Sequence, residues 1–180
     1  MQEEVFFVGE LGGDREALDH LFSLTYEELR RVAASVRRSD PGATLSPTTL
    51  VNEAWIKLSK SPLRGIESPL HFKRLAACAM RQVLIGAARR RIALKRGAAS
   101  LVDFGTEGPM AVANDDQLLA IDAALNDLAK MNPRQAAMVE SRFFGGLEMR
   151  EIAELLQVSE ATLLRDWRAA KAWLAGQIAK

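Results

Sequence analysis

Several residue types are scarce in this chain of 180 residues, and each scarcity excludes a class of protein. The single cysteine, Cys78, excludes an internal disulfide, and the two histidines, His20 and His71, are too few for a zinc site. No apolar run approaches the ~18 residues that span a bilayer. We therefore expect a reduced, metal-free protein without a membrane segment, and we expect it to be cytoplasmic.

Acidic residues are missing from Ser68–Val102, although the whole chain is nearly neutral, with 24 Lys+Arg and 23 Asp+Glu. The bases in this part of the chain are Lys73, Arg74, Arg81, Arg89, Arg90, Arg91, Lys95 and Arg96. The sign then inverts, because Gly97–Ala129 has six acids and no base. Clustered bases are typical of a protein that binds a polyanion, since neutralised phosphates release counterions. A solvated helix face gives the same pattern, so charge alone leaves both interpretations open.

Apolar residues recur at helical spacing through most of the chain, and no long period-2 alternation predicts a strand. We therefore predict an all-α fold with two small helical domains, residues 1–96 and 118–180. An acidic linker, residues 97–117, joins them. The predicted helix boundaries lie at Asp40-Pro41-Gly42, Ser61-Pro62, Ser68-Pro69, Asn132-Pro133 and Gly145-Gly146.

The C-terminal segment has the pattern of a helix-turn-helix. A short helix, Glu148–Leu156, precedes a turn at Gln157-Val158-Ser159 and a second helix from Glu160 to Leu174. The predicted inward side chains, which continue one apolar stripe, are Ile152, Leu156, Val158, Leu163, Trp167 and Leu174, with small Ala153 at the helix crossing. The predicted outward side chains are Ser159, Glu160, Leu164, Arg165 and Arg168. A plain helical hairpin would show the same stripe.

Two features of this motif bear on its use. The second helix of a helix-turn-helix enters the major groove, where Arg is the commonest reader of guanine. Gln157 occupies the place where the tight turn usually has Gly, and a non-Gly residue at positive φ costs about 1 kcal/mol.

Three segments in a fixed order extend the pattern to nearly the whole chain. They are Leu50-Val51-Asn52-Glu53-Ala54-Trp55-Ile56-Lys57-Leu58, Phe72–Arg96, and Asn132–Leu174. From about Asp14 to Leu174, the chain resembles a bacterial RNA polymerase sigma factor of the extracytoplasmic-function (ECF) type. The resemblance implies a sigma region 2 domain that binds polymerase and recognises and melts the −10 element. It also implies a region 4 helix-turn-helix domain that recognises the −35 element.

The resemblance assigns three sets of site residues. The polymerase-binding set is Thr49, Leu50, Glu53, Trp55 and Ile56. The −10 and melting set is Arg81, Gln82, Arg89, Arg90, Arg91, Lys95 and Arg96. The −35 set is Ser159, Glu160, Thr162, Arg165, Arg168 and Lys171. We expect the cationic side chains of these sets to be exposed, and we note that Gly86 stands where the family commonly has an Asp.

The implied function is promoter recognition and transcription initiation with core RNA polymerase and promoter DNA as partners, without catalysis or a cofactor. Where the family usually shows Asp-Ala-Glu-Asp, this chain has Ser46-Pro47-Thr48-Thr49. Phosphorylation would add ~1.5–2 negative charges per site, so we hypothesise activation by modification of Thr48 or Thr49, with Ser46 third. The alternative is that Ser46 or Thr48 serves only as an N-cap.

Regulation and function each have a second interpretation. The chain is similar to a subgroup often found beside Ser/Thr kinases, through Ala88–Arg91 and Arg165–Arg168, so a kinase or an anti-sigma factor is a further candidate partner. The alternative function is a helix-turn-helix transcriptional regulator with a helical dimerisation or sensing domain, which would not need the basic helix Phe72–Arg96. An enzyme is not expected, because no carboxylate cluster, His pair or activated Cys occurs at usable spacing.

Overall fold

The computed structural model describes residues 13–37, 45–61, 66, 68–94 and 115–178. The described residues form helices and turns with no strand, which confirms the predicted all-α fold. The helices are α1 (Gly13–Arg37), α2 (Pro47–Ser59), α3 (Pro69–Leu94), α4 (Asp115–Met131), α5 (Pro133–Gly145), α6 (Met149–Leu155) and α7 (Glu160–Ile178). Among these placed residues, no helix combines the length and the hydrophobicity that a transmembrane span requires.

Helices α2 and α3 each begin at a Ser-Pro pair, and the sequence predicts the second of these, Ser68-Pro69, as a helix boundary. The Ser46 hydroxyl accepts a hydrogen bond from the backbone N–H of Thr49 at 3.0 Å. The Ser68 hydroxyl accepts one from the backbone N–H of His71 at 3.1 Å. Each serine satisfies a backbone donor that the first helical turn leaves unpaired, and the proline that follows has no such donor.

Helix α4 begins earlier than the apolar spacing predicts. Helix α4 starts at Asp115 rather than Leu118, which removes three residues from the predicted linker. Its first turn contains Asp115 and Asp116, and negative charge is favourable beside a helix N-terminus. The predicted break at Asn132-Pro133 is confirmed, as is the end of α5, where Gly146 takes the left-handed conformation with φ 65°.

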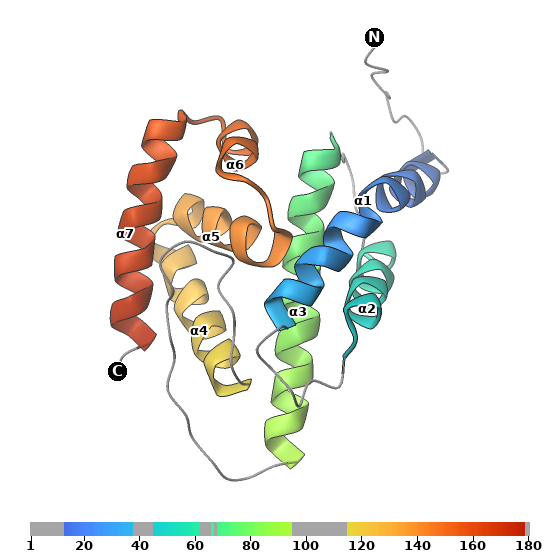
Figure 1. Cartoon of the computed structure of the whole chain (residues 1–180), viewed down its shortest axis with the longest axis horizontal. Coiled ribbons are helices and arrows are strands. Elements are labelled where there is room, and N and C mark those ends of the chain that lie inside the picture. The colour runs from blue at the N-terminus through green and yellow to red at the C-terminus, as the bar shows by residue number, and fades with distance from the viewer. Residues whose placement is uncertain (1–12, 38–44, 62–65, 67, 95–114, 179–180) are drawn as a thin grey trace.

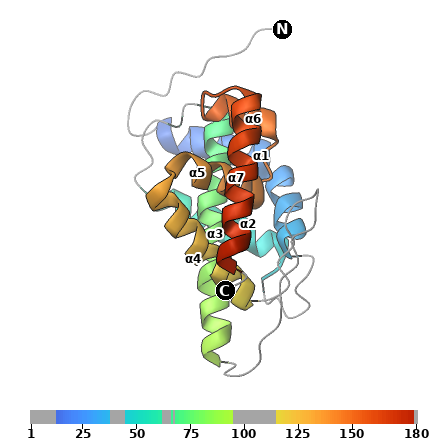
Figure 2. The same ribbon diagram turned by 90° about the vertical axis from the view of Figure 1, so that its left-hand side faces the viewer.

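Helix α3 lies in the middle of the molecule, with α1 and α2 on one side and α4 to α7 on the other (Figure 1). It packs extensively against α2, α4 and α5. The fully buried side chains come from both halves of the chain, and the largest include Phe72, Met80, Met138 and Phe144. The two predicted domains are therefore in contact, and their boundaries stay a prediction. Seen from the α7 side, α7 stands in front of α3 (Figure 2).

Candidate nucleic-acid interface

Helices α6 and α7 form the predicted helix-turn-helix. Gln157 adopts the left-handed conformation with φ 53° at the turn between them. The Ser159 hydroxyl accepts a hydrogen bond from the backbone N–H of Thr162 at 3.2 Å, which confirms Ser159 as the N-cap of α7. At the start of α6, the backbone N–H of Glu148 donates to the Glu151 carboxylate at 2.7 Å. Local hydrogen bonds thus fix both helix starts.

The faces of the motif are those that the apolar spacing predicts. The buried side chains are Ile152, Ala153, Leu163 and Leu174. Leu156, Val158 and Trp167 are half-buried and pack against the same core. The exposed side chains are Ser159, Glu160, Leu164, Arg165 and Arg168, whereas Thr162 and Lys171 are half-buried. Helix α7 therefore presents a polar face of the kind that enters a major groove.

Asp166 fastens α7 to α5 between these two exposed arginines. Its carboxylate accepts hydrogen bonds from the Arg134 Nε at 2.8 Å and from the Gln135 side chain at 3.4 Å. The side chain of Asp166 is only 13% exposed, so the one acid in this stretch of α7 faces inward. Arg165 and Arg168 keep their positive charge on the outer face. Sequence reasoning did not find this contact, because Arg134 is 32 residues away.

Arg81, on α3, lies inside the molecule rather than on a free surface. Its side chain is 12% exposed, as is that of Asp122 on α4. The Arg81 guanidinium donates to Asp122 Oδ1 at 2.9 Å, to Glu140 Oε1 on α5 at 2.9 Å and to Asn126 Oδ1 at 2.8 Å. The expectation that Arg81 is exposed is wrong, because acids from the second half of the chain surround it.

The other members of the −10 set divide into two groups. Gln82, Arg89 and Arg90 are exposed, and Arg89 also reaches Asp122 at 3.4 Å. Arg91 is 12% exposed and forms an ion pair with Asp115, so the expectation of exposure is wrong for Arg91 as well. The predicted Lys95 and Arg96 lie outside the described residues.

Cys78 lies on α3 at the same contact. Its thiol donates a hydrogen bond to Glu140 Oε2 at 3.0 Å. Burial, followed by the negative charge of Glu140, raises the pKa of the Cys78 thiol to about 12. The thiol therefore stays protonated at ordinary pH and is a poor nucleophile, because the thiolate is the reactive form.

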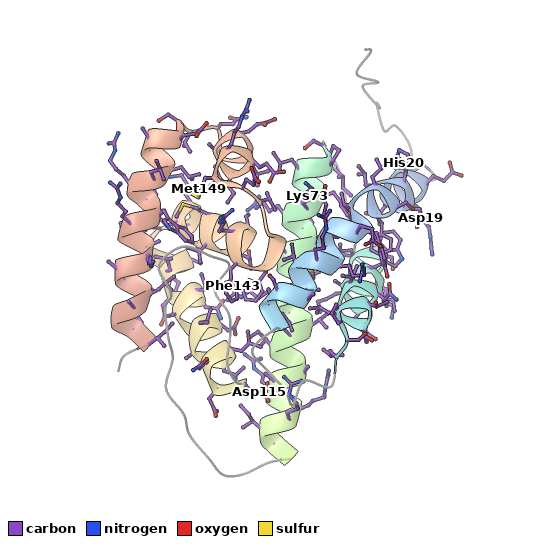
Figure 3. The ribbon with its side chains drawn as sticks, viewed as in Figure 1. Asp19, His20, Lys73, Asp115, Phe143 and Met149 are labelled. Atoms are coloured by element: carbon purple, nitrogen blue, oxygen red, sulfur yellow. The ribbon has the colours of Figure 1, made fainter. Side chains whose placement is uncertain are left out.

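Lys73, near the start of α3, bridges both halves of the chain (Figure 3). Its ammonium group lies 3.1 Å from Glu151 on α6 and also pairs with Glu28 on α1. Burial lowers the pKa of Lys73, but the hydrogen bonds to Glu28 and Glu151 together raise it by more than burial lowers it. The pKa of Lys73 therefore lies above its ordinary value. Lys73 is thus a charged contact between α1, α3 and α6.

Helix α2 carries the predicted polymerase-binding set. Thr49, Glu53 and Ile56 are exposed, and Ile56 is 42% exposed despite its apolar side chain. Trp55 is half-buried and stacks on Phe22 of α1, with ring centroids 4.6 Å apart and an interplanar angle of 22°. Leu50 is fully buried, so its assignment to the polymerase surface is corrected. It belongs to the inner stripe of α2, since Leu50, Val51, Ala54 and Leu58 are the buried residues of that helix.

A comparison with protein families supplies the decisive observation. The model of the family described as "ECF sigma factor" matches residues 11–180, which covers both halves of the chain. The chain belongs to the ECF sigma factor family. No curated protein and no solved structure gives a significant match.

As an ECF sigma factor, the protein acts in transcription initiation and binds core RNA polymerase and promoter DNA. Members of the family are DNA-binding regulators rather than enzymes. The match includes the N-terminal half with α2 and α3, and this decides against the alternative of a regulator with a separate dimerisation or sensing domain.

Proposed function

We propose that three helices of this ECF sigma factor each contact a different partner or promoter element. The exposed face of α2, with Thr49, Glu53 and Ile56, docks on core polymerase. The basic face of α3 captures and helps to melt the −10 element. Helix α7 reads the −35 element, and the observation that carries this role is the exposed pair Arg165 and Arg168 on a helix whose apolar side is buried.

The exposed side chains of α3 suit contacts with the phosphate backbone of DNA better than recognition of individual bases. Arg89 and Arg90 are exposed and supply positive charge along the helix for phosphates. Gln82 is exposed and brings an amide for a base edge. Gly86, one turn further on, has no side chain, so a base contact at that level of the helix is absent. We therefore propose that Gln82 sets the base preference at the −10 element.

We further propose that phosphorylation at the start of α2 strengthens polymerase binding. The first turn of α2, which lies wholly within the described residues, carries no acidic side chain. Ser46, Thr48 and Thr49 are all exposed there. A phosphate at a helix N-terminus lies at the positive end of the helix dipole. It also adds negative charge, which Lys and Arg side chains of the polymerase would bind.

The three hydroxyls differ in how they serve the helix. The Ser46 hydroxyl accepts the backbone N–H of Thr49 and lies 2.8 Å from the Thr49 hydroxyl. The Thr48 side chain takes no part in this cap, so its modification leaves the N-terminus of α2 intact. Thr48 is therefore the preferred acceptor, and a Ser/Thr kinase is the proposed partner, with an anti-sigma factor as the other candidate regulator.

Run-off transcription with core polymerase tests the proposed function. The protein should direct specific initiation from promoters of its own genome, and it should bind core polymerase without DNA. Glu53→Lys on α2 should weaken polymerase binding, while Arg165→Ala on α7 should weaken promoter binding and leave polymerase binding unchanged. Transcription that does not depend on the added protein would contradict the proposal.

The phosphorylation proposal has its own matched pair of variants. Thr48→Asp should raise the affinity for core polymerase in a titration. Ser61→Asp adds the same charge at an exposed position just beyond the opposite end of α2 and should not raise the affinity. Equal affinities of Thr48→Asp and the unmodified chain would refute the proposed switch, as would an equal gain for Ser61→Asp.

A further inference from the structure

The acids of α4 and α5 occupy the basic face of α3 in the way that phosphates would. The carboxylates of Asp122 and Glu140 both accept hydrogen bonds from the Arg81 guanidinium, and Asp115 forms an ion pair with Arg91. The guanidinium group binds carboxylates and phosphates with the same fork of donors. A guanidinium whose donors already bind carboxylates has little capacity left for a nucleic acid. The basic face of α3 is thus partly saturated by the chain itself.

A second feature is the close packing of the C-terminal end of α5 against α3 and α1. A Cβ atom added to Gly145 of α5 would lie 2.9 Å from the Cβ of Ala77 on α3. A Cβ atom on Gly146 would collide with the Val32 side chain of α1. The end of α5 therefore approaches α1 and α3 with bare backbone, and only residues without a side chain fit there.

A third feature bears on the strength of the packing between α3 and α5. The buried Nε of Arg74 on α3 and the buried Oγ of Ser141 on α5 have no hydrogen-bond partner within the described part of the chain. Unmet polar groups and buried ion pairs make an interface weaker than an apolar one of the same size. Interfaces between domains of one chain resemble transient protein–protein interfaces, so separation of the two halves is expected under competition.

We propose that the C-terminal half is an intramolecular cap on α3, which keeps Arg81 and Arg91 from nucleic acid until the two halves separate. This inference rests on the proposed melting role of α3. Polymerase and promoter DNA would shift the equilibrium to the open arrangement, because only that arrangement offers Arg81 and Arg91 to phosphates. The free protein is then latent toward single-stranded DNA, although its α7 face is already exposed.

A pair of charge-matched double variants tests the cap. Asp122→Asn/Glu140→Gln keeps the side-chain shapes and removes the two carboxylates that hold Arg81. Asp127→Asn/Glu154→Gln removes two charges from exposed positions on α4 and α6. The probe is a mixed-sequence single-stranded 15-nucleotide DNA, and the readouts are its affinity and the radius of gyration of the protein from small-angle X-ray scattering.

The first double variant should bind the oligonucleotide about tenfold or more tightly than the unmodified chain, as expected if the open fraction of the unmodified chain is at or below about one tenth. Its radius of gyration should also increase. The second double variant should match the unmodified chain in both readouts. An equal gain for both variants would assign the effect to net charge and overturn the proposal, as would no gain for either.

Cys78 provides a measurement that does not depend on removing a carboxylate. It is the only cysteine in the chain, and it lies in the contact between α3 and α5. Iodoacetamide should alkylate Cys78 slowly in the unmodified protein and at least about tenfold faster in Gly145→Val, whose side chain cannot fit against Ala77. Rapid alkylation of the folded, unmodified protein would overturn the proposal without any variant.

These readouts need neither polymerase nor promoter. If the DNA-binding, scattering and alkylation results contradict the expected ones, the cap is refuted, but the proposed sigma-factor roles of α2, α3 and α7 are not. A failure of run-off transcription with a confirmed cap would instead remove the proposed role of α3.

Discussion

The two helices assigned to DNA differ in how much of their basic face is available. On α7, Arg165 and Arg168 are exposed, and the neighbouring Asp166 faces inward. On α3, Arg81 and Arg91 are each 12% exposed and bind acids of the C-terminal half. In the free chain, the outer face of α7, which we propose reads the −35 element, is therefore exposed, whereas two arginines of α3, which we propose contacts the −10 element, are paired with acids of the protein itself.

The position of each helix in the fold explains this difference. Helix α7 lies at the edge of the molecule and packs on α4, α5 and α6, so its outer face stays open (Figure 1). Helix α3 is central and packs on helices from both halves. A basic side chain that a central helix buries is stable only when acids meet it, because an unpaired buried charge is very unfavourable.

The largest effect is expected on stability when a basic side chain is removed from each helix. Arg81→Met should lower the free energy of unfolding by about 3–5 kcal/mol, because it removes the guanidinium group that pairs with both Asp122 and Glu140 inside the fold. Arg165→Met, at an exposed position, should change it by less than about 0.5 kcal/mol. Urea denaturation measures both, and similar values for the two variants would abolish the distinction.

For binding of the free protein to duplex −35 DNA, substitutions on α7 should have a larger effect than substitutions on α3. Arg165→Ala or Arg168→Ala should weaken binding by about 1–3 kcal/mol if that arginine reads a base with two hydrogen bonds. The control is Arg90→Ala on α3, which should leave binding to this duplex unchanged. Titration against a matched and a scrambled site separates two roles, since an equal loss on both sites would mean a phosphate contact only.

The Cys78 thiol predicts a pH dependence that belongs to the contact between α3 and α5. The folded thiol has a pKa of about 12, whereas an unfolded thiol ionises near pH 8.5–9, so the folded state keeps its proton longer. The stabilisation is present below pH 9 and is lost as pH rises toward 12. At pH 10 the free energy of unfolding should have fallen by about 1–2 kcal/mol relative to Cys78→Ala. Parallel pH profiles for both proteins would show that the thiol is not buried at this contact.

The smallest effect concerns the turn before α7. Gln157→Gly should raise the free energy of unfolding by about 1 kcal/mol, because glycine adopts a φ of 53° without steric strain. Gln157→Ala keeps the strain and should bring no gain. Thermal unfolding measures both variants, and a gain for alanine would point to the glutamine side chain rather than the backbone.

Local patterns predicted the helix ends and the helix-turn-helix. The N-caps Ser46, Ser68 and Ser159, and the turn at Gln157, depend on residues only a few positions apart. The buried stripe of α7 likewise follows from the helical period. Such features are visible in the sequence because the interacting groups are close along the chain.

The contact between the two halves could not be predicted in the same way. The basic and acidic blocks are both visible in the sequence, but the bases point to DNA as their partner, and most of the acids fall in the predicted linker, residues 97–117. Arg81 meets Asp122 across 41 residues and Glu140 across 59 residues, and no local pattern pairs them. Leu50 was assigned to polymerase although it also fits the inner stripe of α2, and only the packing decides that it is buried.

The distance between α2 and α7 tests the closed arrangement most directly. Dyes on cysteines placed at the exposed positions Asn52 and Ala172, with Cys78→Ala as background, report this distance by single-molecule energy transfer. If the C-terminal half caps α3, the free protein should show one short distance, and the complex with core polymerase and promoter DNA should show a longer one. The same distance in both states would contradict the proposed cap.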